Sequence, residues 1–213
     1  MNIKIISTYD KNYKDLFDLT SPTVIKYAKK YGYSFEYYKV PETFERPSAW
    51  FKIKTIQENI KYFDYLLWID VDAIIFNESY ALQDFIVNDK SLYFSKDING
   101  LNSGVMLLKS DKIVEDFFLE VWNQTEDIYH PCWEQTPMRK LIDNNFINIQ
   151  DKIQYVPQYI FNAYDYSDMI PDPYPDGNLC LESFVFHVPG WPKDKRKNKL
   201  QQSINLKLRY FND

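Results

Sequence analysis

The sequence predicts an α/β domain in which helices flank a mixed, mainly parallel central sheet. Strand-like segments at 3–8, 35–40 and 65–69 alternate with helical patterns, which is the order of parallel α/β units. The third segment is continuously apolar, as expected of a central strand that is covered on both faces. A chain of 213 residues is long enough for one well-packed domain and short for two.

Two helices are expected between these strands. Ser21 is a predicted N-cap and Pro22 a first-turn proline, followed by helical spacing up to Tyr31, and Gly32 ends the helix. The second helix spans about 48–60. Its apolar face carries Trp50, Ile53, Ile56 and Ile60.

The second half of the chain continues the alternation. Further strands are predicted at 91–95, 103–108 and 184–188, and further helices at 112–122 and 134–142. Residues 157–180 combine four prolines with several aromatic residues, so we expect an ordered aromatic loop there rather than a linker.

Charge and composition exclude some classes of function. A net charge of -5 argues against a general polyanion-binding protein, and hence against a nucleic-acid partner. The basic end is the exception, because residues 191–213 hold 7 basic and 2 acidic residues. For the run 193–199 we favour a solvated helix start over a membrane or nucleic-acid contact. An aromatic content of 18% suits sugars or bases as ligands.

Compartment and membrane association can be predicted from three features. Cys132 and Cys180 lack zinc-like spacing and fit a reducing compartment. The amino-terminal segment lacks the apolar core of a signal peptide, and no 18-residue apolar run occurs. We therefore expect a soluble, cytoplasmic protein without stable membrane insertion.

An acidic pair inside an apolar stretch is the most informative feature. Asp70 and Asp72 lie within the apolar run 65–76, and no Lys, Arg or His occurs from 62 to 89. Burying carboxylates is costly unless a cation compensates. In an extended backbone, Cβ atoms two residues apart lie roughly 6–7 Å apart on one side. A divalent-metal site is therefore favoured, and two solvated aspartates in a turn are the alternative.

A second polar cluster closes the last predicted strand. His187 could be a core histidine, but with Asp70 and Asp72 it would complete an oxygen and nitrogen donor set, which favours Mn²⁺ over Mg²⁺. Lys193 follows a Pro/Gly turn and could neutralise a diphosphate beside the metal. Its alternative interpretation is one charge in a solvated tail.

Seven short motifs occur in one order along residues 3–193. They are Ile5–Tyr9, Ser48–Lys52, Leu67–Ala73, Leu101–Val105, Trp133–Gln135, Phe161–Tyr164 and His187–Lys193. In that order they resemble the nucleotide-sugar-dependent glycosyltransferases of the GT-A fold, in the retaining galactosyl/xylosyltransferase group. One departure concerns Trp133, where the family often has an acidic residue, which affects acceptor binding and any nucleophile assignment.

The resemblance implies a metal site and a nucleotide site. Asp72 and His187 would ligate Mn²⁺, with Mg²⁺ as the alternative, and Asp70 would contact the ribose and, directly or through water, the metal. The other implied nucleotide contacts are Thr8 and Tyr9 at the uracil and Gly190 and Lys193 at the β-phosphate. Lys52 would be donor-binding or structural.

The resemblance also implies where the sugar lies. Asn102, Ser103 and Gly104 would line the donor sugar, and Gln135 with Glu134 would lie near the anomeric carbon as catalytic residues. The whole chain, 1–213, would be one domain. Its parts would be a nucleotide- and metal-binding half (1–110), a donor and acceptor half (111–190) and a basic segment (191–213).

The sequence thus favours a Mn²⁺-dependent glycosyltransferase. It would move a sugar from a UDP-sugar of the glucose, galactose or rhamnose class to a glycan acceptor, with retention of configuration. Front-face attack is the favoured route, and a covalent intermediate on Glu134 is the weaker one. A nucleotidyl- or phosphotransferase is one alternative, but the Gly-rich phosphate loop that would favour it is missing, since no glycine precedes Gly32. A non-catalytic sugar-binding module is the other, and it would ignore the nucleotide.

Overall fold

The central element is a six-stranded mixed sheet in the order β2-β1-β3-β6-β5-β7. The computed structural model describes residues 1–166 and 175–211. The strands are β1 (Ile3–Tyr9), β2 (Ser34–Lys39), β3 (Tyr65–Ile69), β5 (Leu92–Asp97), β6 (Gly100–Lys109) and β7 (Ile153–Tyr155). The pairs β1–β2, β1–β3 and β5–β7 are parallel, whereas β6 runs antiparallel to both of its neighbours. The predicted mainly parallel α/β fold is confirmed.

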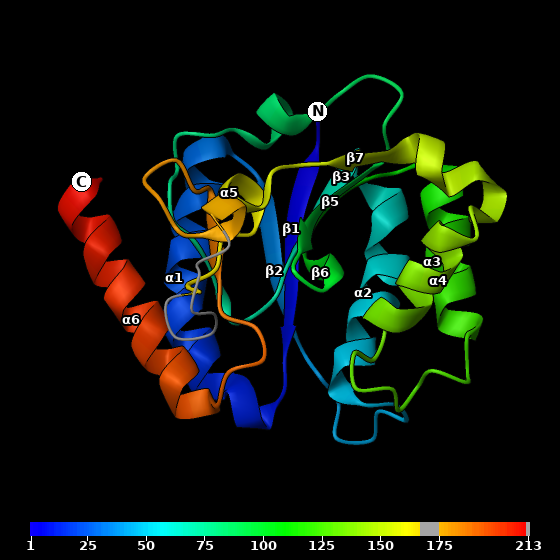
Figure 1. Cartoon of the computed structure of the whole chain (residues 1–213), viewed down its shortest axis with the longest axis horizontal. Coiled ribbons are helices and arrows are strands. Elements are labelled where there is room, and N and C mark those ends of the chain that lie inside the picture. Colours follow the sequence, from blue (N-terminus) through cyan, green and yellow to red (C-terminus); the bar gives the residue numbers. More distant parts are fainter. Residues whose placement is uncertain (167–174, 212–213) are drawn as a thin grey trace.

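Helices cover both faces of this sheet (Figure 1). On one side lie α2 (Phe51–Asn59), α3 (Lys112–Asn123) and α4 (Gln135–Asp143), and on the other lie α1 (Lys14–Tyr31), α5 (Gln158–Phe161) and α6 (Lys193–Tyr210). None of the helices in the described part of the chain has the length and apolar composition needed to cross a membrane.

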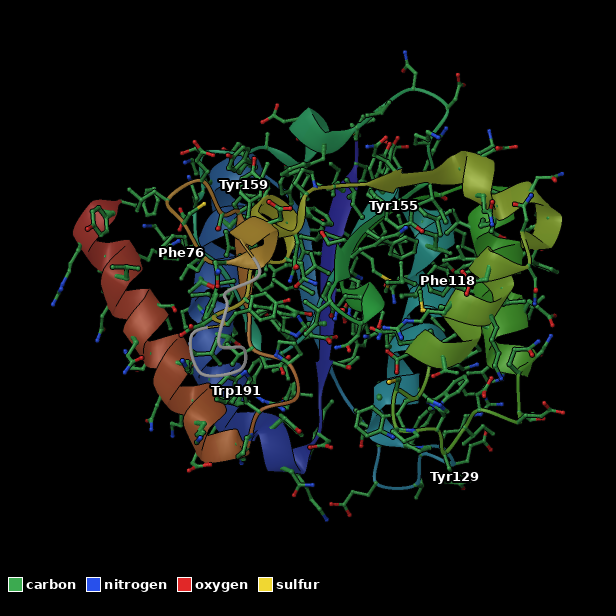
Figure 2. The ribbon with its side chains drawn as sticks, in the orientation of Figure 1. Phe76, Phe118, Tyr129, Tyr155, Tyr159 and Trp191 are labelled. Carbon is green, nitrogen blue, oxygen red and sulfur yellow. The ribbon has the colours of Figure 1, made fainter. Side chains whose placement is uncertain are left out.

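Successive side chains of the central strand point to opposite faces of the sheet, so an apolar core lies on each face. Trp68 packs among residues of α2, α3 and α4, whereas its neighbours Leu67 and Ile69 pack in the cluster that contains α1 residues. A third apolar cluster, which includes Phe76 and Trp191, joins α6 to the rest (Figure 2). The central strand is therefore buried on both faces, as its continuous apolar sequence predicted.

A second, two-stranded sheet positions the end of the chain. It pairs β4 (Ala73–Ile75) antiparallel with β8 (Val185–His187), with Ala73 opposite His187. The predicted strand at 184–188 is present, but β4 and β7 were not predicted. The apolar run 65–76 looks continuous in sequence, whereas in the structure a turn at 70–72 divides it into β3 and β4.

The start predicted for the first helix was wrong. The cap is Asp10, whose side chain accepts hydrogen bonds from the amides of Asn12 and Tyr13, and a 3-10 turn leads into α1 at Lys14. Pro22 therefore lies inside the helix. Gly32 does end it, in the left-handed conformation with φ 71°. Of the predicted aromatic loop at 157–180, residues 167–174 lie outside the described residues.

Candidate active site

The acidic pair occupies a turn at the carboxyl end of β3. The Asp70 amide donates to the Gly104 carbonyl oxygen at 2.8 Å, and the Ala73 amide donates to the Asp70 carbonyl oxygen at 3.0 Å. The expected extended backbone through Asp70 and Asp72 is therefore wrong, because a turn separates β3 from β4. The carboxyl end of a central strand is nevertheless where α/β sheets bind ligands.

The pairing of β4 with β8 brings His187 to this turn. Ala73 lies opposite His187, and the Val188 amide donates to the Asp72 carbonyl oxygen at 3.1 Å. Residues more than a hundred positions apart in sequence thereby share one site. The imidazole is buried, with 2% of its surface exposed.

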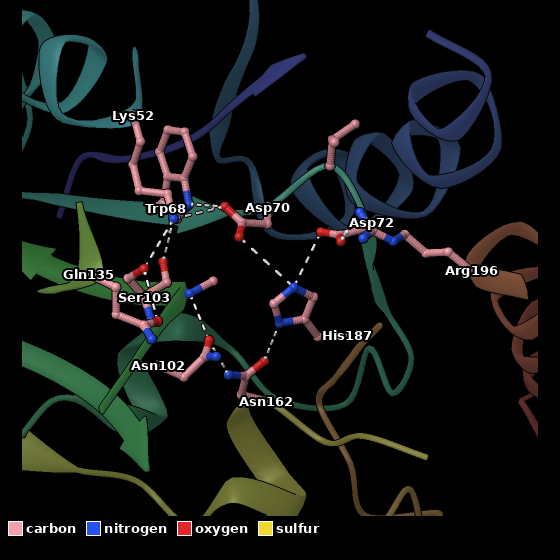
Figure 3. A network of polar contacts seen from close by, with 12 residues as sticks. Lys52, Trp68, Asp70, Asp72, Asn102, Ser103, Gln135, Asn162, His187 and Arg196 are labelled. Carbon is pink, nitrogen blue, oxygen red and sulfur yellow. Dashed lines mark hydrogen bonds and ion pairs between the residues drawn. The ribbon is translucent and has the colours of Figure 1, made fainter. Parts of the chain in front are cut away.

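Each carboxylate has one oxygen held by the protein and one directed at His187 (Figure 3). Asp70 Oδ1 accepts from Trp68 Nε1 at 2.7 Å and lies 3.1 Å from Lys52 Nζ, while Asp70 Oδ2 lies 3.9 Å from His187 Nε2. Asp72 Oδ2 lies 2.8 Å from an Arg196 nitrogen, and Asp72 Oδ1 lies 3.2 Å from His187 Nε2. The three potential ligand atoms lie within 4.8 Å of one another.

The compensating cations come from distant helices. Lys52 belongs to α2 and Arg196 to α6, and both side chains are buried. Burial alone would raise the pKa of the Asp72 carboxyl, but the charged form of His187 and Arg196 hold it below its ordinary value. Against the effect of burial, Asp70 and Glu134 raise the pKa of Lys52 to about 12. Arg196 was not predicted as a site residue, because its basic surroundings indicated a solvated helix start.

This arrangement fits a divalent cation. Two ligands at roughly 2.1 Å from one ion lie about 3 Å apart, close to the separation of Asp72 Oδ1 and His187 Nε2. Two carboxylates and an imidazole are a donor set suited to Mn²⁺. Among the described residues, Glu134 Oε2 and Arg196 Nε are buried polar atoms without a hydrogen-bond partner, which is a common property of ligand sites.

Gly104 leaves the space that the imidazole fills. A Cβ atom at this position would lie 2.1 Å from His187 Cε1 and 2.6 Å from Nδ1. We expect Gly104→Ala to displace the ring and to weaken Mn²⁺ binding by about 10-fold or more, measured by isothermal titration calorimetry. The thermal unfolding midpoint controls for a global effect, and wild-type affinity in a folded variant would contradict the packing argument.

A second polar cluster adjoins the acidic pair. Lys52 Nζ lies 2.8 Å from Glu134 Oε1 and 3.0 Å from the Ser103 carbonyl oxygen. Ser103 Oγ donates to Glu134 Oε1 at 3.0 Å, and the Ser103 amide donates to Gln135 Oε1 at 2.9 Å. The structure therefore joins Asp70, Ser103, Glu134 and Gln135 around one buried ammonium group.

The comparison with known families decides the assignment. The galactosyl transferase GMA12/MNN10 family matches residues 7–93 and 87–185, which together make up most of the chain. The chain belongs to this family.

Individual relatives agree with the family match. An uncharacterized alpha-1,2-galactosyltransferase of Schizosaccharomyces pombe is 28% identical over 88% of this chain, which spans 64% of that relative's length. A glycosyltransferase involved in the glycosylation of the major capsid of PBCV-1 has a TM-score of 0.72 at 19% identity, with 95% of this chain and 100% of that chain covered. The galactosyltransferase LgtC has a TM-score of 0.62 at 15% identity, with 96% and 95% covered. The two solved structures confirm the GT-A fold.

The residues of this family member that are expected to bind the nucleotide have the following local contacts. Tyr9 ends β1, and its ring stacks on Phe17 with centroids 4.3 Å apart. Lys193 Nζ lies 2.8 Å from Asp15 Oδ1, and the hydrogen bond lowers the pKa of Asp15. Gly190 has a φ of 73° and open space where a Cβ would lie. The uracil role of Thr8 and Tyr9 and the phosphate role of Gly190 and Lys193 stay predictions.

Three aromatic residues of this family member differ in their exposure. Trp191 and Tyr164 are buried, whereas Trp133 is 46% exposed beside Glu134 and has a φ of 41°. A positive φ is uncommon for a bulky residue and is found most often at functional sites. Of the three rings, that of Trp133 is therefore the one accessible for stacking against a sugar.

Proposed function

We propose that the chain is a Mn²⁺-dependent glycosyltransferase that transfers a sugar from a UDP-sugar to a glycan hydroxyl with retention of configuration. The donor would be of the glucose, galactose or rhamnose class. The observation that carries this proposal is the convergence of Asp70 Oδ2, Asp72 Oδ1 and His187 Nε2 within 4.8 Å of one another. Membership of a galactosyl transferase family supports the glycosyl-transfer part.

The chain's own residues would divide the work between donor and metal. Asp70, Asp72 and His187 would hold the ion, with Mg²⁺ as the alternative. A divalent ion bound there would offset the negative charge that develops on the leaving diphosphate. Gly190, in the loop after β8, and Lys193, at the start of α6, would bind the β-phosphate. The half at 1–110 would hold nucleotide and metal, with His187 added to the metal site from the half at 111–190, which would otherwise hold donor and acceptor.

The state of the two residues expected near the anomeric carbon supports front-face attack as the route to retention. Glu134 is 3% exposed, and its Oε1 already contacts Lys52 and Ser103. Gln135 Oε1 accepts a hydrogen bond from the Ser103 amide. Glu134 Oε2 has no hydrogen-bond partner among the described residues but is buried, and Gln135 is a neutral amide, which favours front-face attack over a covalent intermediate.

In front-face attack the donor supplies its own base. The bond from the anomeric carbon to the diphosphate oxygen breaks as the bond to the acceptor oxygen forms on the same face. The acceptor's hydroxyl proton passes to the departing diphosphate oxygen, so charge and atoms balance. Ser103 and Gln135 would orient the sugar, which becomes oxocarbenium-like as the leaving bond stretches.

Calorimetry of UDP binding tests the proposal. We expect UDP to bind measurably when Mn²⁺ is present and about 10-fold or more weakly when it is chelated. A panel of nucleotide sugars then identifies the donor by Mn²⁺-dependent hydrolysis. Indifference to UDP would contradict the proposal and point to a sugar-binding module, whereas release of the nucleoside monophosphate would indicate a nucleotidyl- or phosphotransferase.

A further inference from the structure

A chain of hydrogen bonds leads from a backbone amide to the imidazole at the acidic pair (Figure 3). We propose that Asn102 and Asn162 are positioning residues that hold His187 in the tautomer with its proton on Nδ1. The Nε2 lone pair then faces Asp70 and Asp72. The use of this lone pair for a metal ion rests on the proposed function, whereas the tautomer itself does not.

The Gly104 amide fixes the first donor of the hydrogen-bond chain, because a backbone N–H can only donate. This amide lies 2.8 Å from Asn102 Oδ1, which identifies that atom as the oxygen of the Asn102 side chain. The contacts of the Asn102 side-chain nitrogen support the same orientation. Asn102 Nδ2 donates to Asp97 Oδ2 at 3.0 Å and to the Tyr164 hydroxyl at 2.6 Å, and a carboxylate can only accept.

The orientation of the Asn162 side-chain amide follows from that of Asn102. Asn162 Nδ2 donates to Asn102 Oδ1 at 2.8 Å, so the oxygen of Asn162 points away from Asn102. That oxygen lies 2.9 Å from His187 Nδ1. An amide oxygen can only accept, so Nδ1 must donate and the neutral ring carries its lone pair on Nε2.

The Asn162 side chain and the Asp72 carboxylate favour opposite tautomers of His187. Asp72 Oδ1 lies 3.2 Å from His187 Nε2 and would favour a proton there, which would block the lone pair. The three members of the relay, Asn102, Asn162 and His187, are 6%, 0% and 2% exposed. Bulk water therefore cannot replace a lost partner, and an unpaired polar group at this depth is costly.

The second histidine supplies an internal contrast. His130 Nδ1 accepts from the Cys132 amide at 3.1 Å, so its neutral ring carries the proton on Nε2. The chain contains two histidines, and the structure assigns them opposite tautomers.

Nitrogen-15 NMR of the imidazole rings tests the relay directly. Long-range proton–nitrogen correlations are recorded on the metal-free protein and read from the neutral rings at the alkaline end of a pH series. We expect one ring protonated on Nδ1 and the other on Nε2. His130→Gln should remove only the signals of the ring that is protonated on Nε2. A neutral His187 protonated on Nε2 would overturn the proposal.

A pair of variants at one position separates positioning from packing. Asn162→Leu removes the acceptor, and we expect the His187 proton to move to Nε2 and the Mn²⁺ affinity to fall by about 10- to 100-fold. Asn162→Asp loses the donor to Asn102 Oδ1 but keeps an oxygen acceptor for His187 Nδ1, so we expect it to keep the proton on Nδ1 even if the leucine variant does not fold. An Nδ1 proton in a folded Asn162→Leu protein, or its loss in Asn162→Asp, would refute the relay.

The two proposals fail in different ways. If wild-type His187 carries its proton on Nδ1 but Mn²⁺ does not bind, the metal part of the proposed function fails and the relay stands. If Mn²⁺ binds a protein whose neutral His187 is protonated on Nε2 beforehand, the metal site stands and the relay fails.

Discussion

Asp72→Asn is expected to lower Mn²⁺ affinity and Mn²⁺-dependent sugar transfer by at least about 100-fold. A metal ion contributes several kcal/mol to stabilising developing charge, and each 1.36 kcal/mol is about tenfold in rate. Asp72 Oδ1 is the oxygen nearest to His187 Nε2, and the amide that replaces the carboxylate carries no charge. Isothermal titration calorimetry measures the affinity, and hydrolysis of the nucleotide sugar measures the rate.

Stability must be followed in the same variant. Removing the charge of Asp72 leaves Arg196 buried without its carboxylate partner, so some loss of folding stability is expected. The double variant Asp72→Asn, Arg196→Met should recover stability but not metal binding. Asp116→Asn, in a surface ion pair with Lys112, serves as the matched control and should change neither. Transfer at the wild-type rate by Asp72→Asn would refute the metal role.

Lys52→Met is expected to produce the largest loss of stability, about 3–5 kcal/mol in the free energy of unfolding. The ammonium group is buried and lies 2.8 Å from Glu134 and 3.1 Å from Asp70, so its removal leaves two carboxylates without their cation. Chemical denaturation followed by circular dichroism measures the effect. Adding Glu134→Gln should restore part of the loss, because it removes one of the two uncompensated charges.

The pH dependence of this loss follows from the pKa of Lys52. Its value in the folded protein, about 12, lies above the ordinary 10.5. The stability contributed by the charged form is therefore fully present below about pH 10.5 and is lost as the pH rises through 12. The difference between wild type and Lys52→Met should stay constant from about pH 6 to pH 9. A difference below about 1 kcal/mol would show that the pair resembles an exposed ion pair.

The sequence predicted the elements that depend on local patterns. The continuously apolar β3 and the amphipathic α3 and α4 were placed within a residue or two of the observed bounds. The start of α1 was missed because Asp10 acts through a 3-10 turn, a geometry that no spacing rule reveals. The short strands β4 and β7 have three residues each, too few to show a periodicity.

Site residues could be predicted where a charged side chain stands in an apolar stretch of sequence. Carboxylates in an apolar run need a compensating cation, and Asp70 with Asp72 was singled out in that way. In the structure, Lys52 and Arg196 supply part of this compensation. Arg196 and Lys52 could not be assigned, because their partners lie far away in sequence and neither is unusual in its own segment. The orientation of Asn162 depends on a backbone amide at Gly104, which only coordinates can reveal.

The last helix has a consequence for how the protein is made. Arg196 in α6 contacts Asp72, and Lys207, further along α6, contacts Glu78 and the Ile75 carbonyl oxygen. Residues 193–210 leave the ribosome after every other element described here. A nascent chain that has already folded its central sheet would therefore hold Asp72 without its guanidinium partner, so the site gains its final charge balance only once α6 has docked.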